Sequence, residues 1–397
     1  MLTFLLQYYS APTQQAATGV PLQMITLRSA LAALIAFLLA LWLGPRLIRW
    51  LRTRFQEPLE SRSSVLRELH KHKQATPTMG GLFVMLAIAS GIVLFGDLRN
   101  PFLLLCLALL TALSALGAYD DLVKLRRGDG LRARTKLAIQ ILIALAIAVS
   151  VYSIHRQEPR GLELVIPLTG ISIQLGMWFV PLAVLVLVGS SNAVNLTDGL
   201  DGLASGCLIF AFGAIGALVY AAGHSGIAEY LGVIPIQHAG ELTILVGATT
   251  GALLGFLWFN CQPAQVFLGD TGSLPLGGLL GFVAIVSRQE LLLLVIGGVF
   301  VVEALSVIVQ VGFFKLRGRR IFLCAPLHHH FQFRGWPESK VVTRFWIASV
   351  LCAVVGLLGA RLTSGVPGPS TDRAAIVDHA AAEDHLANHT RDHRLPR

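Results

Sequence analysis

The sequence has little charge and few cysteines, and both shortages limit what the protein can be. Only 13% of its 397 residues are charged, whereas 54% are hydrophobic. Soluble domains carry roughly 25% charged residues, so the composition excludes an ordinary soluble protein. The five cysteines are scattered without a CxxC pair. This spacing argues against a disulfide framework or a cysteine metal site and favours small apolar packing residues.

The sequence is instead rich in long apolar runs. A helix needs about 20 apolar residues to cross a bilayer, and we count ten such runs. All are expected to be helices, because an open sheet leaves backbone groups unsatisfied in lipid. The composition therefore predicts an all-α polytopic membrane protein, with spans at about 22–43, 77–96, 101–119, 136–153, 177–191, 203–222, 241–259, 272–288, 290–314 and 341–361.

The remaining segments define the domain organisation. Residues 1–21 are expected to form an exterior lead-in, and residues 22–362 a single transmembrane domain. Residues 363–397 are polar and are expected to form a disordered tail. Between spans 4 and 5, the stretch 162–175 alternates in hydropathy and contains Thr169-Gly170, a pattern that predicts a small exterior β-hairpin.

Basic residues gather in three loops. Arg46–Lys73 carries eight Lys or Arg, Lys124–Lys136 carries six and Lys315–Arg344 carries seven. With ten spans, all three loops lie on one side, and the positive-inside rule makes that side cytoplasmic. Both termini are then outside. Such clusters also suit nucleic acid, but beside membrane spans lipid and phosphate partners are favoured over nucleic acid.

The most polar stretch at a span end is Asn192-Ala-Val-Asn195-Leu-Thr-Asp198-Gly-Leu-Asp201-Gly. Ionisable groups at a membrane edge are rare and usually functional. Asp198 and Asp201 are three residues apart, so on a helical turn they share one face. The alternative is a short polar loop whose Asn and Asp cap the adjoining helices.

Two further polar motifs open or close spans. Asp120-Asp121-Leu-Val-Lys124 ends span 3, and paired carboxylates suit a divalent metal or acid–base work; a solvated helix end is the alternative. His70-Lys-His-Lys73-Gln-Ala-Thr76-Pro-Thr-Met-Gly-Gly precedes span 2. It suits a phosphate site, or an ordinary helix start with proline in its first turn.

The loop before span 8 reads Gly269-Asp270-Thr-Gly-Ser. Free backbone N–H groups at such a helix start are a natural phosphate site, and a glycine-rich turn with an Asp cap is the alternative. In span 9, Glu303 and Gln310 share a helical face that is expected to look into the bundle. His328-His329-His330 follow, and a loop of histidines beside basic residues suits a diphosphate or a proton transfer.

All these polar motifs fall on the cytoplasmic face if there are ten spans, and the exterior loops carry no comparable motif. Several Asp together with basic residues on one membrane face predict a divalent cation and a phosphorylated, lipid-linked substrate. Mg²⁺ typically takes one or two carboxylates and substrate phosphates.

At this point the motifs resemble a known family. Five motifs carry the resemblance: His-Lys-Gln-Ala-Thr-Pro-Thr-Met-Gly-Gly, the Asp120-Asp121 motif, Asn195-Leu-Thr-Asp198-Gly-Leu-Asp201-Gly, Phe267-Leu-Gly-Asp-Thr-Gly-Ser and Ala325-Pro-Leu-His-His-His-Phe. They are similar to the motifs of bacterial phospho-N-acetylmuramoyl-pentapeptide transferases. The resemblance covers about residues 20–362, in order. It implies a catalytic transmembrane domain that moves the phospho-sugar of UDP-N-acetylmuramoyl-pentapeptide onto undecaprenyl phosphate, with Mg²⁺ required and UMP released.

The resemblance also implies roles for individual residues. Asp270 would hold Mg²⁺, Asp121 would support the metal and phosphates, and Asp120 would deprotonate the lipid phosphate or attack as a nucleophile. Asn195 and Asp198 would line the nucleotide-sugar site, and the uridine pocket would comprise Asp201, Asn260 and Phe267. Diphosphate charge would be neutralised by Lys73, Lys136, His328, His329 and His330, with His329 also catalytic. Further substrate contacts would come from Thr76, Lys124, Gly269 and Gln310.

Two other functions share parts of this pattern and can be distinguished from the transferase activity. A transferase of GlcNAc-1-phosphate onto the same lipid shares the Asp motifs, but Ala325-Pro-Leu-His-His-His-Phe argues against it. A cation transporter would place its site near the midplane, often across an internal repeat, whereas these Asp lie at one edge and no repeat is visible. The resemblance further implies the bacterial inner membrane as location, with the site on the cytoplasmic face, and a possible homodimer.

Overall fold

The computed structural model describes residues 25–54, 76–169, 171–231 and 233–363, and helices dominate them. Eight helices in this part are long and apolar enough to cross a membrane, and two shorter apolar helices bring the number to ten. The shorter two are α4 (Gly81–Phe95) and α11 (Asp270–Val286). The chain is therefore an all-α polytopic membrane protein, as its composition predicts.

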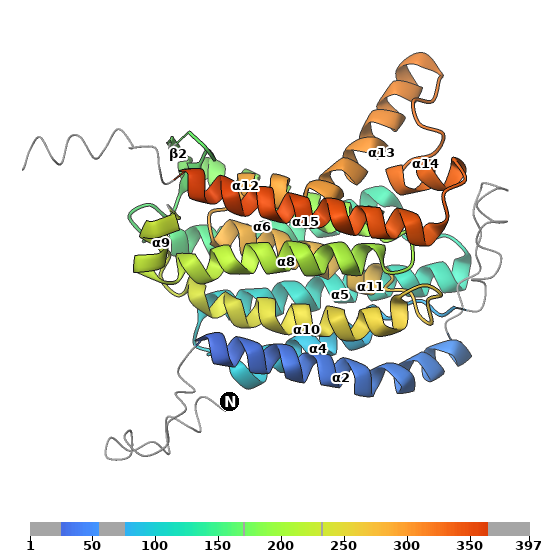
Figure 1. Cartoon of the computed structure of the whole chain (residues 1–397), viewed down its shortest axis with the longest axis horizontal. Coiled ribbons are helices and arrows are strands. Elements are labelled where there is room, and N and C mark those ends of the chain that lie inside the picture. The colour runs from blue at the N-terminus through green and yellow to red at the C-terminus, as the bar shows by residue number, and fades with distance from the viewer. Residues whose placement is uncertain (1–24, 55–75, 170, 232, 364–397) are drawn as a thin grey trace, which may run out of the picture.

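The long helices mostly lie side by side, with their connections gathered at the two ends, and α13 (Gly298–Arg317) leans out of the bundle (Figure 1). They are α2 (Ile25–Arg54), α5 (Pro101–Arg127), α6 (Ala133–His155), α7 (Phe179–Thr197), α8 (Leu203–Ala222), α10 (Leu242–Asn260), α13 (Gly298–Arg317) and α15 (Glu338–Thr363). The short elements are the turns η2 (Gly176–Trp178) and η3 (Ala239–Glu241) and the helices α9 (Ser225–Leu231), α12 (Glu290–Ile296) and α14 (Leu327–Phe333).

The predicted hairpin is present. Strands β1 (Glu163–Val165) and β2 (Ser172–Gln174) pair antiparallel, with Leu164 opposite Ile173. The hairpin and α9 lie at one end of the bundle, and α14 lies at the other (Figure 1). We refer to these as the hairpin end and the α14 end.

Helix α11 forms the centre of the bundle. All 17 of its residues are buried, and it packs against α5, α7, α8 and α4. Its glycines permit close approach: Gly277 lies against the backbone of Ser190 and Ser191 on α7. Small residues at such contacts let helices pack tightly in lipid, where apolar surface alone does not drive association. The short, glycine-rich character of this span is explained by its central position.

Several predicted span boundaries are wrong. Span 1 does not end at Gly44-Pro45, because α2 continues through Pro45 to Arg54. A proline disturbs the carbonyls of the preceding turn, and here the Arg46 guanidinium donates to the Trp42 carbonyl at 2.6 Å. Span 3 continues to Arg127, where Gly128 ends α5 with a φ of 80°. Span 9 is broken into α12 and α13 at Gly297.

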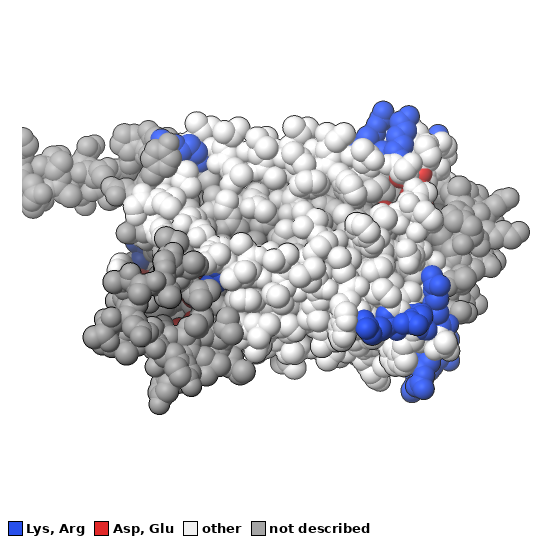
Figure 2. All heavy atoms as spheres, turned by 60° about the horizontal axis from the view of Figure 1, so that its bottom comes forward, with Lys and Arg blue, Asp and Glu red and all other residues white. Residues whose placement is uncertain are grey.

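Charge is distributed unevenly over the surface. Figure 2 shows most of the visible Lys and Arg side chains at the α14 end and a broad band without charge beside them. Helices α2, α5 and α13 each place basic residues in their last turn. The uncharged band is the part of the surface that suits the lipid core. Cys106 and Cys207 are buried, in agreement with the expected packing role, whereas Cys261 is exposed and departs from it.

Candidate active site

Three carboxylates from two helices meet at the α14 end of the bundle. Asp120 and Asp121 lie near the end of α5, and Asp270 is the first residue of α11. All three are buried, with 2%, 3% and 7% of their surfaces exposed. Neighbouring carboxylates repel one another, and buried charges are costly unless paired. The cluster therefore requires positive charge nearby.

Two lysines supply that charge. The Nζ atom of Lys124, one turn after Asp120 on α5, lies 2.9 Å from Oδ2 of Asp270 and 3.2 Å from Oδ2 of Asp120. The Nζ atom of Lys136, on α6, lies 3.2 Å from Oδ2 of Asp120 and forms an ion pair with Oδ2 of Asp270. Residues from separate sequence motifs thus form one salt-bridge network.

Asp121 is directed toward the start of α11. Its carboxylate accepts hydrogen bonds from the backbone N–H groups of Asp270 and Thr271, at 3.2 and 3.0 Å, and from the Thr271 hydroxyl at 2.7 Å. The next two N–H groups of the helix donate to the carbonyl of Gly269. The prediction of free N–H groups for a phosphate is therefore wrong, because the carboxylate and the helical turn already use them.

Asp120 is held by the loop between α5 and α6. Its Oδ1 atom accepts a 2.6 Å hydrogen bond from the backbone N–H of Leu131. A Cβ atom at Gly130 would lie 2.7 Å from that oxygen and 2.9 Å from Cε of Lys124, so a larger residue would displace the cluster. Sequence reasoning missed Gly130, because no local pattern shows that this loop folds back onto α5.

Asn195 connects α7 to the cluster. Its amide Nδ2 donates to Oδ1 of Asp270 at 2.7 Å and to the Ser273 hydroxyl at 2.8 Å. Gly269, which the resemblance names as a substrate contact, has a φ of 72°, and a Cβ there would lie 2.7 Å from Oδ2 of Asp121. Both residues therefore belong to the immediate surroundings of the carboxylates.

A second polar group lies at the turn between α7 and α8. The Asp201 carboxylate accepts a 3.0 Å hydrogen bond from the backbone N–H of Ala264. The Asn260 side chain accepts one from the backbone N–H of Gly202, also at 3.0 Å. Asp201 and Asn260 are both buried and tie this turn to the loop after α10. Their contact with uridine remains a prediction.

The other residues expected near the nucleotide lie around the same loop. Asp198 follows the last residue of α7 and is half-buried, as is Phe267. The Phe267 backbone N–H donates to the Pro77 carbonyl at 2.9 Å. Thr76 is half-buried, and its hydroxyl lies 3.4 Å from the Ala264 carbonyl. Lys73 lies outside the described residues, as do the lead-in 1–21 and the tail from 364 onward.

The three histidines lie on the short helix α14 and not in a loop. His328 is fully buried, and its Nδ1 atom lies 3.3 Å from Oε2 of Glu303 on α13. His329 is half-buried, with Nδ1 2.8 Å from Oε1 of Gln332. The prediction that Glu303 looks into the bundle is confirmed, since none of its surface is exposed.

His330 is also half-buried. Its Nδ1 atom accepts a 3.1 Å hydrogen bond from the backbone N–H of Leu323. Burial and the neighbouring Arg334 lower the pKa of His330, which favours a neutral imidazole at neutral pH. In this arrangement the ring supports the loop before α14, and its contact with a diphosphate remains a prediction.

Gln310 supports the same loop. Its side-chain amide donates to the Phe322 carbonyl and accepts from the backbone N–H groups of Ile321 and Phe322, each at 3.0 Å. Its predicted substrate contact is untested, whereas its contact with the loop is direct. The side chain is half-buried.

The donor set at the cluster suits a hard divalent cation, because Mg²⁺ prefers carboxylate and phosphate oxygens. Both lysines reach Asp120 as well as Asp270, so a cation at these carboxylates would replace charge that the lysines now supply. Within the described residues, no three His, Cys, Asp or Glu side chains already converge as metal ligands. The site therefore fits the cation by chemistry and requires the lysines to move.

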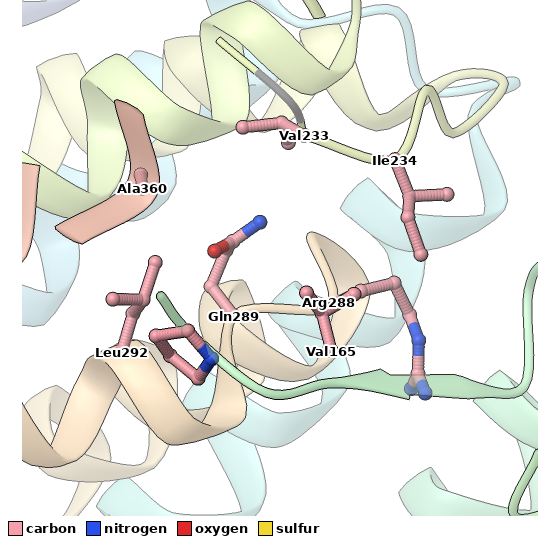
Figure 3. A pocket seen from close by; sticks show the side chains of 8 residues that line it. Val165, Val233, Ile234, Arg288, Gln289, Leu292 and Ala360 are labelled. Atoms are coloured by element: carbon pink, nitrogen blue, oxygen red, sulfur yellow. The ribbon is translucent and has the colours of Figure 1, made fainter. Parts of the chain in front are cut away.

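A pocket at the hairpin end differs in character. Gln289 points into it, and Arg288 extends toward β1 (Figure 3). The rest of the lining is apolar and consists of Val165, Pro167, Val233, Ile234, Leu292 and Ala360. None of the residues that the sequence predicts for the site lines this pocket. The candidate active site is therefore the carboxylate cluster at the α14 end.

Comparisons with known proteins address the family of the chain. The family model described as "Glycosyl transferase family 4" matches residues 102–288, a range that contains the three carboxylates and both lysines. The chain is thus a multi-pass membrane protein whose residues 102–288 are similar to this glycosyl transferase family.

More similar relatives narrow the class. Phospho-N-acetylmuramoyl-pentapeptide-transferases from Koribacter versatilis, Solidesulfovibrio magneticus and Nitratidesulfovibrio vulgaris are 45%, 46% and 48% identical to the chain. The alignments cover 85%, 85% and 84% of this chain and 93%, 94% and 92% of the relatives. The chain belongs to the phospho-N-acetylmuramoyl-pentapeptide-transferase family.

Proposed function

We propose that the protein transfers phospho-N-acetylmuramoyl-pentapeptide from its UDP-linked precursor to undecaprenyl phosphate, in the bacterial inner membrane with its site on the cytoplasmic face. The relatives' names support the activity. The observation that supports this assignment of the active site is the buried cluster of Asp120, Asp121 and Asp270 with Lys124 and Lys136. Phosphoryl transfer needs mostly positioning and charge neutralisation from a protein, and this cluster offers both.

In the proposed reaction, a phosphate oxygen of the lipid attacks the β-phosphorus of the UDP-sugar. The bond between that phosphorus and the bridging oxygen breaks, and UMP leaves with the oxygen. We assign Asp120 as the base that prepares the lipid phosphate. A phosphate monoester has its second pKa near 6, so it needs little assistance at neutral pH, and direct attack is favoured over a covalent Asp120 intermediate.

The remaining chain groups hold charge in place. Mg²⁺ bound at Asp270 would neutralise phosphate charge. Lys124 and Lys136 would turn from Asp270 toward the diphosphate, while Asn195 keeps its amide on Oδ1 of Asp270. Phe267 would stack on uracil, a contact worth about 1–3 kcal/mol. Assembly as a homodimer remains a prediction.

The assay is UMP release by the purified protein, with and without Mg²⁺ and polyprenyl phosphate. We expect release only when both are present, and little release when UDP-GlcNAc replaces the pentapeptide precursor. Preference for UDP-GlcNAc would identify the rival transferase. A burst of UMP without the lipid, lost in Asp120→Asn, would establish the covalent route instead.

A matched pair of variants tests the cluster. Asp270→Asn should lower turnover on the order of 10²- to 10³-fold, the usual scale for losing one electrostatic contact to a transition state. Asp129→Asn removes an exposed carboxylate from the adjoining loop and should leave turnover unchanged. Near-normal Mg²⁺-dependent turnover of Asp270→Asn would contradict the metal assignment.

A further inference from the structure

A buried acid–histidine pair lies beside the site and has no role in the reaction described above. Glu303 on α13 and His328 on α14 are both completely buried. Oε1 of Glu303 accepts the backbone N–H of His328 at 3.1 Å, and Oε2 lies 3.3 Å from the ring Nδ1. One carboxylate thus contacts both the backbone and the side chain of the same residue.

The polar atoms of this pair are poorly satisfied. Within the described residues, Oε2 of Glu303 and both ring nitrogens of His328 have no hydrogen-bond partner of good geometry. Buried polar atoms without partners are costly, so such atoms usually indicate a functional constraint. A proton on Nδ1 would place a donor next to Oε2 and leave Nε2 directed away from Glu303.

The Nε2 edge of the ring rests on the turn after α7. A Cβ atom at Gly199 would collide with Nε2 of His328 and lie 2.9 Å from its Cε1. This turn follows Asn195, whose amide bonds Asp270. The ring of His329 lies 4.2 Å from that of His328, measured between centroids. His328 therefore touches both the turn and the more exposed histidine.

We propose that Glu303 is a positioning residue that acts through His328. It fixes His328 by one contact to its backbone and one to its ring, and the imidazole in turn fixes the 198–202 turn and the His329 ring relative to Asp270. This inference deepens the proposed function and rests on it for its kinetic consequences. A direct substrate contact by His328 is the competing role, but its ring has no exposed surface.

Two substitutions of His328 separate these roles. The amide nitrogen of Asn occupies the place of Nδ1, whereas that of Gln reaches the place of Nε2. His328→Asn can still donate toward Glu303, and His328→Gln can donate only toward the Gly199 turn. Positioning by Glu303 predicts that Asn retains more kcat/KM than Gln. The reverse order would show a direct contact through Nε2 and overturn the proposal.

A double-mutant cycle then tests whether Glu303 acts through His328. Glu303→Gln should lower kcat/KM for the nucleotide substrate about 10- to 100-fold, the range for partners that orient a functional histidine. In a His328→Gln background the same change should have a much smaller effect, because only the contact of Oε1 with the backbone N–H of residue 328 is left. Additive losses would overturn the proposal. Glu290→Gln is the matched control, because Glu290 is an equally buried acid, paired with Arg288 at 2.7 Å at the hairpin end.

A third measurement does not depend on the reaction. Hydrogen–deuterium exchange should become faster in peptides covering 198–202 of Glu303→Gln and remain unchanged in those covering 163–174. Unchanged exchange at the turn would contradict the inference even if turnover fell. Wild-type protein that releases no UMP would instead contradict the proposed function, and the exchange result would still decide the role of Glu303.

Discussion

A single carboxylate oxygen, Oδ2 of Asp270, has two ammonium groups beside it, from Lys124 and Lys136. Such a concentration of positive charge strongly favours the ionised carboxylate. Any cation that binds Asp270 must compete with these lysines, and a diphosphate would attract them away. Substrate and metal are therefore expected to bind with positive cooperativity, because the diphosphate attracts the lysines away from Asp270 and the cation can then take their place.

Gly130 offers a test of how closely the loop must pack on this cluster. In Gly130→Ala the new Cβ atom would lie 2.7 Å from Oδ1 of Asp120 and 2.9 Å from Cε of Lys124, so the carboxylate or the lysine must shift. A 1 Å misplacement at a reacting centre can cost on the order of 100-fold in rate. We expect kcat to fall by about that factor, measured by UMP release.

Gly189→Ala is the control for that substitution. Gly189 lies on α7, and a Cβ there would meet nothing within 4 Å. Alanine in a helix is favoured over glycine by about 1 kcal/mol, so this variant should be as active and at least as stable as the wild type. Equal activity in both variants would show that the loop adapts freely.

At the level of helices, Asp121 attaches α5 to the start of α11. Its carboxylate accepts three hydrogen bonds from Asp270 and Thr271. Since α11 is buried along its whole length, its first turn cannot use water instead. Asp121 therefore has a structural role beside any role toward phosphate or metal.

Replacing Asp121 should lower stability more than its position in an active site suggests. Asp121→Ala leaves buried donors without partners, at about 1–3 kcal/mol each, and the melting temperature in detergent should fall by roughly 5 °C or more. Asp121→Asn keeps an acceptor oxygen and should melt closer to the wild type. Equal melting of Asp121→Ala and wild type would rule out the structural role.

The sequence could predict the helices and the residues of the cluster, because both leave local signals. Apolar runs mark the spans. The number of spans puts all the polar motifs on one side of the membrane, and this argument correctly brings Asp120, Asp121 and Asp270 together at one end of the bundle. The partners of these residues could not be predicted. Whether Asp121 meets a phosphate or the backbone of Thr271, 150 residues away in the chain, depends on how α5 packs on α11.

The same limit explains why the partners of Gln310 and the continuation of α2 beyond Pro45 could not be predicted. Hydropathy places Gln310 on the inner face of span 9, but only the folded loop shows that its amide holds Ile321 and Phe322. Proline predicts the end of a helix from local sterics. Tertiary packing overrides that signal in α2, whose buried residues continue beyond it to Ile48 and Leu51.

On the scale of the whole molecule, the two ends of the bundle use charge differently. At the hairpin end, Arg28 forms an ion pair with Glu241, and Arg288 forms one with Glu290. The Arg28 pair joins residues 213 positions apart, so it leaves no local motif in the sequence. Glu241 and Glu290 thus each pair with one arginine, whereas the α14 end gathers several acids around two lysines.

The exposed cysteine at the α14 end tests the orientation of the molecule in the membrane. Cys261 follows α10 and is exposed, while Leu168, at the hairpin, is 56% exposed. The basic last turns of α2, α5 and α13 lie at the same end as Cys261 in the proposed topology, and the positive-inside rule places that end in the cytoplasm.

In intact cells, a membrane-impermeant maleimide should therefore label Leu168→Cys, in a Cys261→Ser background, without permeabilisation. Cys261 of the wild type should be labelled only after the membrane is opened. The opposite pattern would reverse the topology and place the carboxylate cluster on the side where no nucleotide substrate is available.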